Sequence, residues 1–161
     1  MRKKMTKIVK NDTICDNMKI ERVEPEDIKR VLEIEKISFK DPWSRFAFES
    51  ELLNVDSIFL KALIDEQLVG YIVVRKLVDE FHIMNLAITP EHRKKGVAQA
   101  LLDHVIKNLS SGKLLLLEVR KSNRAAIALY QKNGFSDLHT RKAYYSDGED
   151  AVVMIKEISK G

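Results

Sequence analysis

The stretch LLLLEVR, at residues 114–120, constrains the fold more than any other segment of the chain. Four consecutive leucines bounded by charged residues predict a strand that is buried on both faces. Side chains alternate along a strand, so Leu116, Glu118 and Arg120 share one face. Glu118 therefore places a carboxylate on an otherwise apolar face, which makes it the first candidate for a chemical role.

Strand-like and helix-like segments alternate along the chain after residue 17. Helical spacing of apolar residues predicts helices at residues 25–39, 44–53, 97–110 and 123–134. Runs rich in β-forming residues predict strands at residues 18–23, 57–65, 67–78, 81–88, 114–119, 138–145 and 150–158. The resulting order, β-α-α-β-β-β-α-β-α-β-β, is typical of a single α/β domain with a mixed sheet.

Turn and capping residues sharpen several of these boundaries. Ser44 suits the N-cap of the second helix, and residues 65–66 suit a hairpin turn between two strands. Ser122 or Asn123 can cap the helix that follows LLLLEVR, and Gly134 stands where a left-handed residue would end it.

The composition indicates one domain of a globular protein. The 161 residues are too few for two ordinary domains, and the formal charge of +4 does not by itself argue for nucleic acid. Residues 1–17 are lysine-rich and without periodicity, so we expect a flexible N-terminal extension before a domain at 18–161; Met18 is an alternative translation start. The single cysteine, Cys15, excludes an internal disulfide and favours a reducing compartment.

The remaining composition argues against membrane, metal and secretory roles. No apolar run approaches the roughly 20 residues of a membrane helix, and residues 1–17 lack the apolar core of a signal peptide. The four histidines (82, 92, 104 and 139) have no metal-ligand spacing, so we expect each to have a surface or packing role. We expect a cytoplasmic protein without a metal, a membrane or a direct nucleic-acid partner.

The loop HRKKG, at residues 92–96, precedes a long amphipathic helix. Glycine lets the backbone approach a ligand closely, and the first turn of a helix offers unpaired N–H groups and a positive dipole end. These features, with Arg93, Lys94 and Lys95, predict a phosphate or pyrophosphate site. The loop is neither a Walker motif nor a dinucleotide fingerprint. Taken alone, it is equally compatible with a basic loop in solvent.

The segments NLAITPEHRKKGVAQALL and LLLEVRKSNRAAIALYQKNGF together resemble the GNAT superfamily of acetyl-CoA-dependent N-acetyltransferases. FKDPWS and RKAYYSDGEDAVVM resemble, within it, the bacterial ribosomal-protein alanine acetyltransferases of the RimI type. The resemblance covers residues 18–158 and implies a central mixed, mostly antiparallel, twisted sheet of about seven strands flanked by four helices. It implies direct transfer of an acetyl group from acetyl-CoA to the N-terminal alanine of a small-subunit ribosomal protein.

The resemblance also implies a role for individual residues. Glu118 matches the general base, Tyr130 the general acid, and Asn123 a position near the thiol end of the cofactor. The positions matching those that hold the pantetheine arm and the pyrophosphate are Leu86, Ala87, Ile88, Arg93, Lys94, Lys95, Gly96, Val97, Ala98 and Gln99. Ala98 replaces a glycine of the motif, which the family pattern allows.

The resemblance also places an acceptor groove near two loops. Phe39, Pro42 and Trp43 are apolar residues in a turn, and they match the wall of a groove for a peptide end. Trp43 as a plug of the core is an equally good interpretation. Tyr144 and Tyr145 would point to opposite faces of a strand, and Tyr144 is then favoured for the groove.

The reaction explains why a single carboxylate is a suitable base. At pH 7, deprotonating an N-terminal amine costs about 1 kcal/mol, against about 4.6 kcal/mol for lysine. Burial among leucines should raise the pKa of Glu118 toward neutrality, although pairing with Arg120 is an alternative. Tyr130 has the alternative of a core role. Other acceptors (other protein N-termini, a lysine or a small amine) and a non-catalytic acyl-CoA-binding module also remain open.

Overall fold

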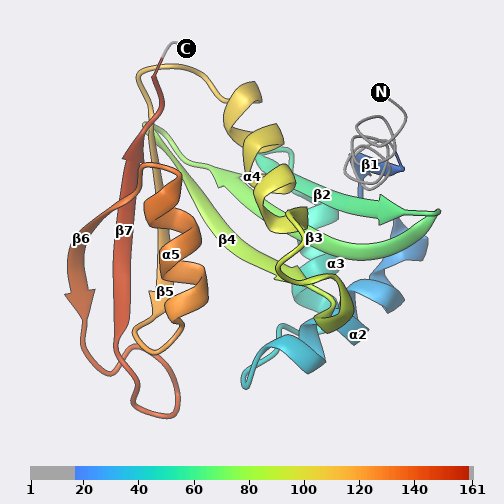
Figure 1. The fold of residues 1–161 in the computed structure, drawn as a ribbon, viewed down its shortest axis with the longest axis horizontal. Coiled ribbons are helices and arrows are strands. Elements are labelled where there is room, and N and C mark those ends of the chain that lie inside the picture. Colours follow the sequence, from blue (N-terminus) through green and yellow to red (C-terminus); the bar gives the residue numbers. More distant parts are fainter. Residues whose placement is uncertain (1–16, 160–161) are drawn as a thin grey trace, which may run out of the picture.

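The computed structural model describes residues 17–159, which form one sheet with helices on both faces (Figure 1). The predicted element order is confirmed, with two short 3-10 turns in addition. The helices are α2 (Ile28–Ser38), α3 (Arg45–Leu53), α4 (Val97–Asn108) and α5 (Arg124–Lys132), and the 3-10 turns are η1 (Pro25–Asp27) and η2 (Pro90–His92). The strands are β1 (Met18–Arg22), β2 (Ser57–Ile64), β3 (Gln67–Lys76), β4 (Glu80–Ile88), β5 (Leu114–Arg120), β6 (Ser136–Arg141) and β7 (Ala151–Glu157). Most of the predicted extension, residues 1–16, lies outside the described residues.

The sheet has the strand order β1-β2-β3-β4-β5-β7-β6. Neighbouring strands are antiparallel except for β4 and β5, which pair in parallel. This parallel pair needs a crossover connection, and α4 provides it. The predicted mixed and mostly antiparallel sheet of seven strands is therefore confirmed.

Two hydrophobic clusters hold the helices against opposite faces of the sheet. One contains Leu101 and Leu102 of α4 and Tyr130 of α5, and the other contains Ile34 of α2 and Phe48 of α3. Figure 1 accordingly shows α4 and α5 in front of the sheet and α2 and α3 behind it. The helices α2 and α3 pack on β2, β3 and β4, so they leave the corresponding face of β5 and β7 uncovered.

Most local signals are confirmed. The Ser44 hydroxyl accepts the Ala47 N–H at 3.1 Å, and the turn at residues 65–66 has φ angles of 50° and 64°. Asn123 caps α5 by accepting the Ala126 N–H, and Gly134 has a φ of 87°.

Two expectations are wrong. Strand β5 is buried on one face only: Leu115 and Leu117 are buried, whereas Leu114 is 39% exposed and Leu116 is half-buried. The reason is that no helix covers the second face at β5. The expected strand at 138–145 is β6, which ends at Arg141, so Tyr144 and Tyr145 lie in a loop with their rings in contact.

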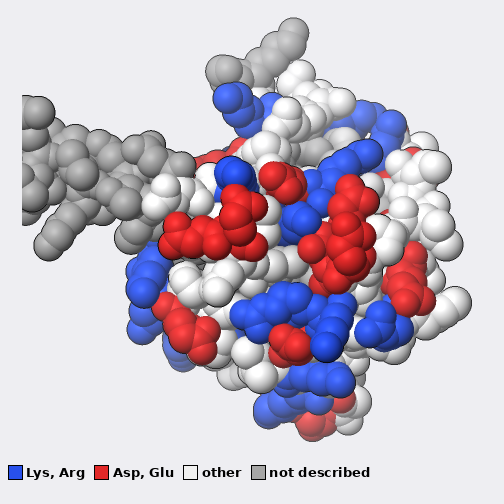
Figure 2. Space-filling view, turned by 90° about the vertical axis from the view of Figure 1, so that its right-hand side faces the viewer, with Lys and Arg blue, Asp and Glu red and all other residues white. Residues whose placement is uncertain are grey.

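The surface around β1 and the β2–β3 turn carries charges of both signs. Figure 2 shows acidic and basic side chains intermixed on this face. An exposed ion pair between Lys19 and Glu66, at 2.7 Å, joins β1 to the β2–β3 turn, while the pair of Lys61 and Asp27, at 2.5 Å, is largely buried between β2 and η1. No helix within residues 17–159 is long and apolar enough to cross a membrane.

Candidate active site

The sheet opens between its two parallel strands. β4 pairs with β5 only from Glu80 to Ile83, opposite residues 114–117, and beyond this point β4 pairs only with β3 and β5 only with β7. A β-bulge lies at the same place, because Val73 pairs with Asn85 and Val74 with Ile83, which leaves Met84 without a partner. The bulge and the lost pairing together part the two strands.

A cavity of about 110 Å³ fills this opening. Its lining joins the two sides of the sheet, since Phe39 follows α2 on one side and Ala126 and Tyr130 belong to α5 on the other. The remaining lining residues come from β4, β5 and the start of α5: Ile83, Met84, Asn85, Leu86, Leu117, Glu118, Val119 and Asn123. The opening thus brings the predicted base Glu118 and the predicted acid Tyr130 to one cavity.

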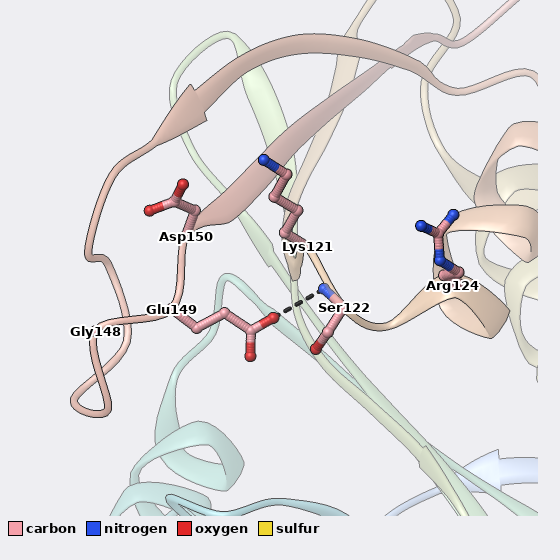
Figure 3. Close-up of a pocket in the computed structure, with 6 residues that line it drawn as sticks. All are labelled: Lys121, Ser122, Arg124, Gly148, Glu149 and Asp150. Atoms are coloured by element: carbon pink, nitrogen blue, oxygen red, sulfur yellow. Dashed lines mark hydrogen bonds between the residues drawn. The ribbon is translucent and has the colours of Figure 1, made fainter.

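A larger hollow of about 520 Å³ lies beside it, after the end of β5 (Figure 3). It is wide open to solvent and is lined by Lys121, Ser122, Arg124 and residues 148–150. Glu118 and Tyr130 are not among its lining residues, so we assign the candidate active site to the smaller cavity.

The Glu118 carboxylate is held by two basic side chains. Its Oε2 lies 2.5 Å from His82 Nε2, and its Oε1 lies 3.8 Å from a guanidinium nitrogen of Arg141. The Glu118 side chain is only 12% exposed. Arg120, the alternative partner from the sequence, binds other carboxylates instead. The alternative interpretation, an ion pair between Glu118 and Arg120, is therefore not found in the described part of the chain.

These contacts reverse the expected pKa shift. The hydrogen bond with His82 lowers the pKa of Glu118 below its ordinary value, burial opposes this, and the electrostatic attraction of His82 and Arg141 adds to the lowering. The prediction of a raised pKa is wrong, because the open face of β5 admits basic neighbours whose effect outweighs that of burial. Glu118 is consequently ionised at neutral pH.

Tyr130 lies on α5 and is only 6% exposed, with its ring edge-on to Phe135 at 5.4 Å. Burial, and to a lesser degree Tyr145, raise the pKa of Tyr130 above its ordinary value. The hydroxyl therefore keeps its proton at neutral pH. The packing role and the proposed chemical role are compatible, because the same residue lines the cavity.

The end of β4 offers a free backbone edge at the opening. Leu86, Ala87 and Ile88 pair with β3 on one side only, so their other edge faces the diverging β5. On the paired side, Gly70 of β3 lets the end of β4 pack closely. A Cβ at this position would lie 2.5 Å from Ile88 Cδ1 and 3.0 Å from the Ala87 carbonyl oxygen. Such an edge suits the amide groups of a pantetheine arm.

The loop before α4 suits a pyrophosphate. Gly96 is the N-cap of α4 with a φ of 86°, it has no side chain to cap the first turn, and no atom of the described residues, apart from its chain neighbours, lies within 4 Å of the position that a Cβ would take. The first-turn N–H groups of Val97, Ala98 and Gln99 are thus left for a ligand. Lys94 and Lys95 are exposed beside them.

Arg93 and Gln99 have internal partners. Arg93 donates to the Ile88 carbonyl oxygen at 2.9 Å and to the Ser38 hydroxyl at 3.2 Å, so its side chain ties the loop to β4 and α2. The Gln99 amide exchanges two hydrogen bonds with Asn133, which fixes the spacing of α4 and α5. Both side chains thus hold the loop before α4 in place, while its backbone N–H groups remain available to a ligand.

The loop of residues 39–44, called the α2–α3 loop, covers one side of the cavity. Phe39 lines the cavity, Pro42 is exposed, and Trp43 is half-buried against Phe48 at 5.2 Å. The Trp43 N–H donates to the buried carboxylate of Glu35 at 3.0 Å. Trp43 therefore belongs to the core as well as to the loop, and Phe39 is the loop residue that reaches the cavity.

The loop of residues 142–150, called the β6–β7 loop, carries Tyr144. Its ring is 46% exposed, meets the Tyr145 ring edge-on at 5.1 Å, and has the Arg141 guanidinium 5.5 Å above it. Burial raises the pKa of the half-buried Tyr145 to about 12. Tyr144 is thus the more accessible of the two rings.

Three residues near the site were missed by the sequence analysis: His82, Arg141 and Glu35. His82 was expected to have a surface or packing role, and only the parallel register that aligns it with Leu116 brings it to Glu118. Glu35 accepts hydrogen bonds from the Tyr71 hydroxyl and, at 2.8 Å, from the Asn85 amide, as well as from the Trp43 N–H. For Glu35 the sequence did hold a signal, because this carboxylate occupies a position in the apolar stripe of the first predicted helix.

Comparisons with known proteins agree with this geometry. The model of the Acetyltransferase (GNAT) family matches residues 28–135. An N-alpha-acetyltransferase of Saccharolobus solfataricus is 32% identical over 83% of this chain and 89% of its own length. The ribosomal protein bS18 alanine N-acetyltransferase of Escherichia coli K12 is 34% identical over 87% of this chain and 97% of its own length. The crystal structure of the E. coli S18 alanine acetyltransferase superposes with a TM-score of 0.81 at 33% identity, covering 89% of this chain and 96% of that one.

Proposed function

The chain belongs to the GNAT family of acetyltransferases, and on this premise we propose that it acetylates the N-terminal α-amine of a protein. The acceptor we propose is the N-terminal alanine of a small-subunit ribosomal protein, in the cytoplasm, with acetyl-CoA as the donor. The observation that carries the proposal is the cavity between β4 and β5, which joins an ionised carboxylate to a buried, protonated tyrosine.

Acetyl-CoA supplies an activated acetyl thioester and a thiolate leaving group. The backbone edge of Leu86, Ala87 and Ile88 would hold its pantetheine arm, and the first turn of α4 after Gly96 its pyrophosphate. Lys94 and Lys95 would add positive charge near the phosphates. Asn123 would lie near the thiol end, since it lines the cavity beside α5.

Glu118 would accept the proton that the amine loses as it attacks. Its low pKa keeps the carboxylate ionised and ready, and the hydrogen bond with His82 fixes its orientation. Tyr130, which keeps its proton, would donate it to the departing sulfur from the α5 side of the cavity. With the base and the acid on two different elements, the two proton transfers can occur on opposite sides of the reacting carbon.

The acceptor would enter between the α2–α3 loop and the β6–β7 loop. Phe39 reaches the cavity from the first loop, and the exposed ring of Tyr144 is available to a peptide from the second. A carboxylate of lowered pKa is a weak base, which favours an α-amine of pKa about 7.7–8.0 over a lysine of about 10.4. The E. coli relative bears the name of a bS18 alanine acetyltransferase, which supports alanine as the terminal residue.

Broader specificity for protein N-termini is the second candidate. The S. solfataricus relative is an N-alpha-acetyltransferase without a named acceptor and is nearly as similar to this chain as the E. coli enzyme. The two candidates differ only in how many N-terminal residues the acceptor groove admits.

A peptide panel tests both candidates. Thiol release from acetyl-CoA should be fastest with the N-terminal peptide of the small-subunit protein that begins with alanine. Ser-, Met- and Gly-initiated variants of that peptide measure the selectivity, and a peptide with a blocked N-terminus and one free lysine is the control. Turnover of the lysine peptide alone would contradict the proposal, while equal rates on all free N-termini would favour the broader candidate. The initial rates should follow a sequential pattern, because the single cysteine of the sequence, Cys15, precedes the proposed domain at 18–161 and would leave that domain without a thiol to form an acetyl-enzyme.

A further inference from the structure

Arg120 lies two residues after Glu118 on the same face of β5, about 6.7 Å along the strand. Its side chain is only 16% exposed, although it projects from the uncovered face of the sheet. One guanidinium nitrogen donates to both Asp147 oxygens, at 3.0 and 2.9 Å, and to Glu149 at 3.0 Å. The other terminal nitrogen lies 3.5 Å from Asp41. One arginine thus gathers three carboxylates from two distant segments of the chain.

The carboxylates belong to two loops: the α2–α3 loop, whose Phe39 lines the cavity, and the β6–β7 loop, which Arg120 ties to β5 next to the cavity. Asp41 is in the α2–α3 loop, and Asp147 and Glu149 are in the β6–β7 loop. Two direct contacts also join the loops, from the Ser146 hydroxyl to Asp41 at 2.5 Å and from Lys40 to Asp147 at 3.4 Å. Arg120 connects both loops to β5 and therefore to the strand that carries the base.

Arg120 also orders the aromatic side chains of the β6–β7 loop. Its guanidinium carbon lies 4.1 Å above the centre of the Tyr145 ring, and the Tyr145 ring meets Tyr144 edge-on. Arg120 consequently positions the exposed ring of Tyr144 indirectly, through its contact with Tyr145. Glu149 anchors the same loop a second time, because it accepts the Ser122 N–H at 2.8 Å just after β5 (Figure 3).

Without the guanidinium, this arrangement would be repulsive. The Glu149 N–H and Arg120 lower the pKa of Asp147 to about 2, so this carboxylate is ionised at neutral pH. Lys40 also pairs with Asp147, at 3.4 Å, but its side chain is largely exposed and contacts only this one of the three carboxylates in the described structure. Like charges that share a site repel one another, so the two loops would tend to separate.

We propose that Arg120 is a positioning residue of the acceptor site, which clamps the α2–α3 loop and the β6–β7 loop together beside Glu118. This inference rests on the proposed function, in which the peptide enters between these loops. Arg120 acts through the loops and does not itself take part in proton transfer. Its loss should weaken binding of the acceptor peptide and leave binding of acetyl-CoA intact, because the cradle for acetyl-CoA lies on β4 and α4.

The test compares Arg120→Met and Arg120→Lys with the wild-type enzyme. Lysine keeps the charge but loses the planar fork and the flat face that stacks on Tyr145. The KM for the alanine-initiated peptide should rise about tenfold in Arg120→Met and about threefold in Arg120→Lys. The dissociation constant of acetyl-CoA, measured by calorimetry, should stay within about twofold of the wild-type value in both.

Arg30→Met is the matched control. Arg30 ties α2 to β3 by donating to the Leu68 carbonyl oxygen at 3.1 Å, and it also pairs with Glu33 at 3.0 Å. It is therefore an arginine with a long-range contact away from the two loops. Its substitution should leave the peptide KM unchanged even where the melting temperature falls.

The outcomes separate the clamp from the proposed function. A wild-type enzyme that acetylates no N-terminal peptide contradicts the proposed function. If the wild-type enzyme acetylates an N-terminal peptide and both Arg120 variants have the wild-type KM for that peptide, the clamp is contradicted. Equal loss of peptide and acetyl-CoA binding also contradicts it, since that result indicates general destabilisation. If Arg120→Met does not fold, the Arg120→Lys value decides alone.

Discussion

Replacing Glu118 with glutamine tests the proposed base with little change in shape. Glutamine keeps an oxygen that can accept a hydrogen bond from His82, so the 2.5 Å contact and the packing on β5 can persist. What it loses is the ability to take a proton. Removal of a general base typically costs 10²–10⁴-fold, and we expect about 100-fold at pH 7.

The loss should shrink as the amine becomes neutral by itself. An α-amine of pKa about 7.8 is about 14% neutral at pH 7 and about 94% neutral at pH 9. This sevenfold gain benefits the variant more than the wild type, because the wild-type carboxylate removes the proton at either pH. If the deficit is 100-fold at pH 7, dividing it by this sevenfold gain gives a deficit of about 15-fold at pH 9.

The assay is thiol release at saturating acetyl-CoA and peptide, from pH 6.5 to pH 9.5. Glu49→Gln is the control, because it removes one carboxylate from an exposed pair with Arg45 on α3. An equal deficit for Glu118→Gln at all pH values would mean that the carboxylate positions the substrate and takes no proton. A full rate at pH 7 would refute the role altogether.

Three further outcomes follow from the same geometry. Tyr130→Phe should lower kcat at least about tenfold with little change in the acetyl-CoA dissociation constant by calorimetry, and an unchanged kcat would exclude Tyr130 as the acid. Gly70→Ala should destabilise the fold by about 1–3 kcal/mol in urea unfolding, because its Cβ would overlap Ile88. Because the pKa of Glu118 is lowered on folding, this group stabilises the folded state at pH values above its unfolded pKa of about 4.3. This stabilisation is lost as the pH falls through the lower pKa of the folded state. The wild type should thus lose more unfolding free energy than Glu118→Gln between about pH 5 and pH 3, and equal losses would contradict the shift.

The element order was predictable because each signal is local. The cap at Ser44 and the turn at residues 65–66 depend on a few consecutive residues, and both are confirmed. The position of Glu118 on β5 followed from strand alternation alone. Its partners did not, because His82 reaches it through the parallel register of β4 and β5 and Arg141 through the pairing of β6 with β7.

The same limit explains the wrong pKa prediction. Four leucines indicate an apolar strand, but they do not reveal how far the neighbouring helices extend over it. α2 and α3 stop at β4, so the face of β5 that holds Glu118 and Arg120 is left to charged partners. The bulge at Met84 could not be read from the sequence either, since a bulge is a property of the pairing of two strands.

The parting of β4 and β5 links the proposed base to the proposed cofactor site. If the parallel pairing continued past Ile83 and Leu117, Met84 would lie opposite Glu118, and the edge of Leu86–Ile88 would be used by β5. The divergence therefore frees the backbone edge that suits pantetheine and, in the same step, makes room beside Glu118 for an acceptor. A substitution that closed the gap would weaken donor and acceptor binding together, whereas loss of Arg120 should weaken only acceptor binding. This difference makes the strand opening the feature on which both halves of the proposed site depend.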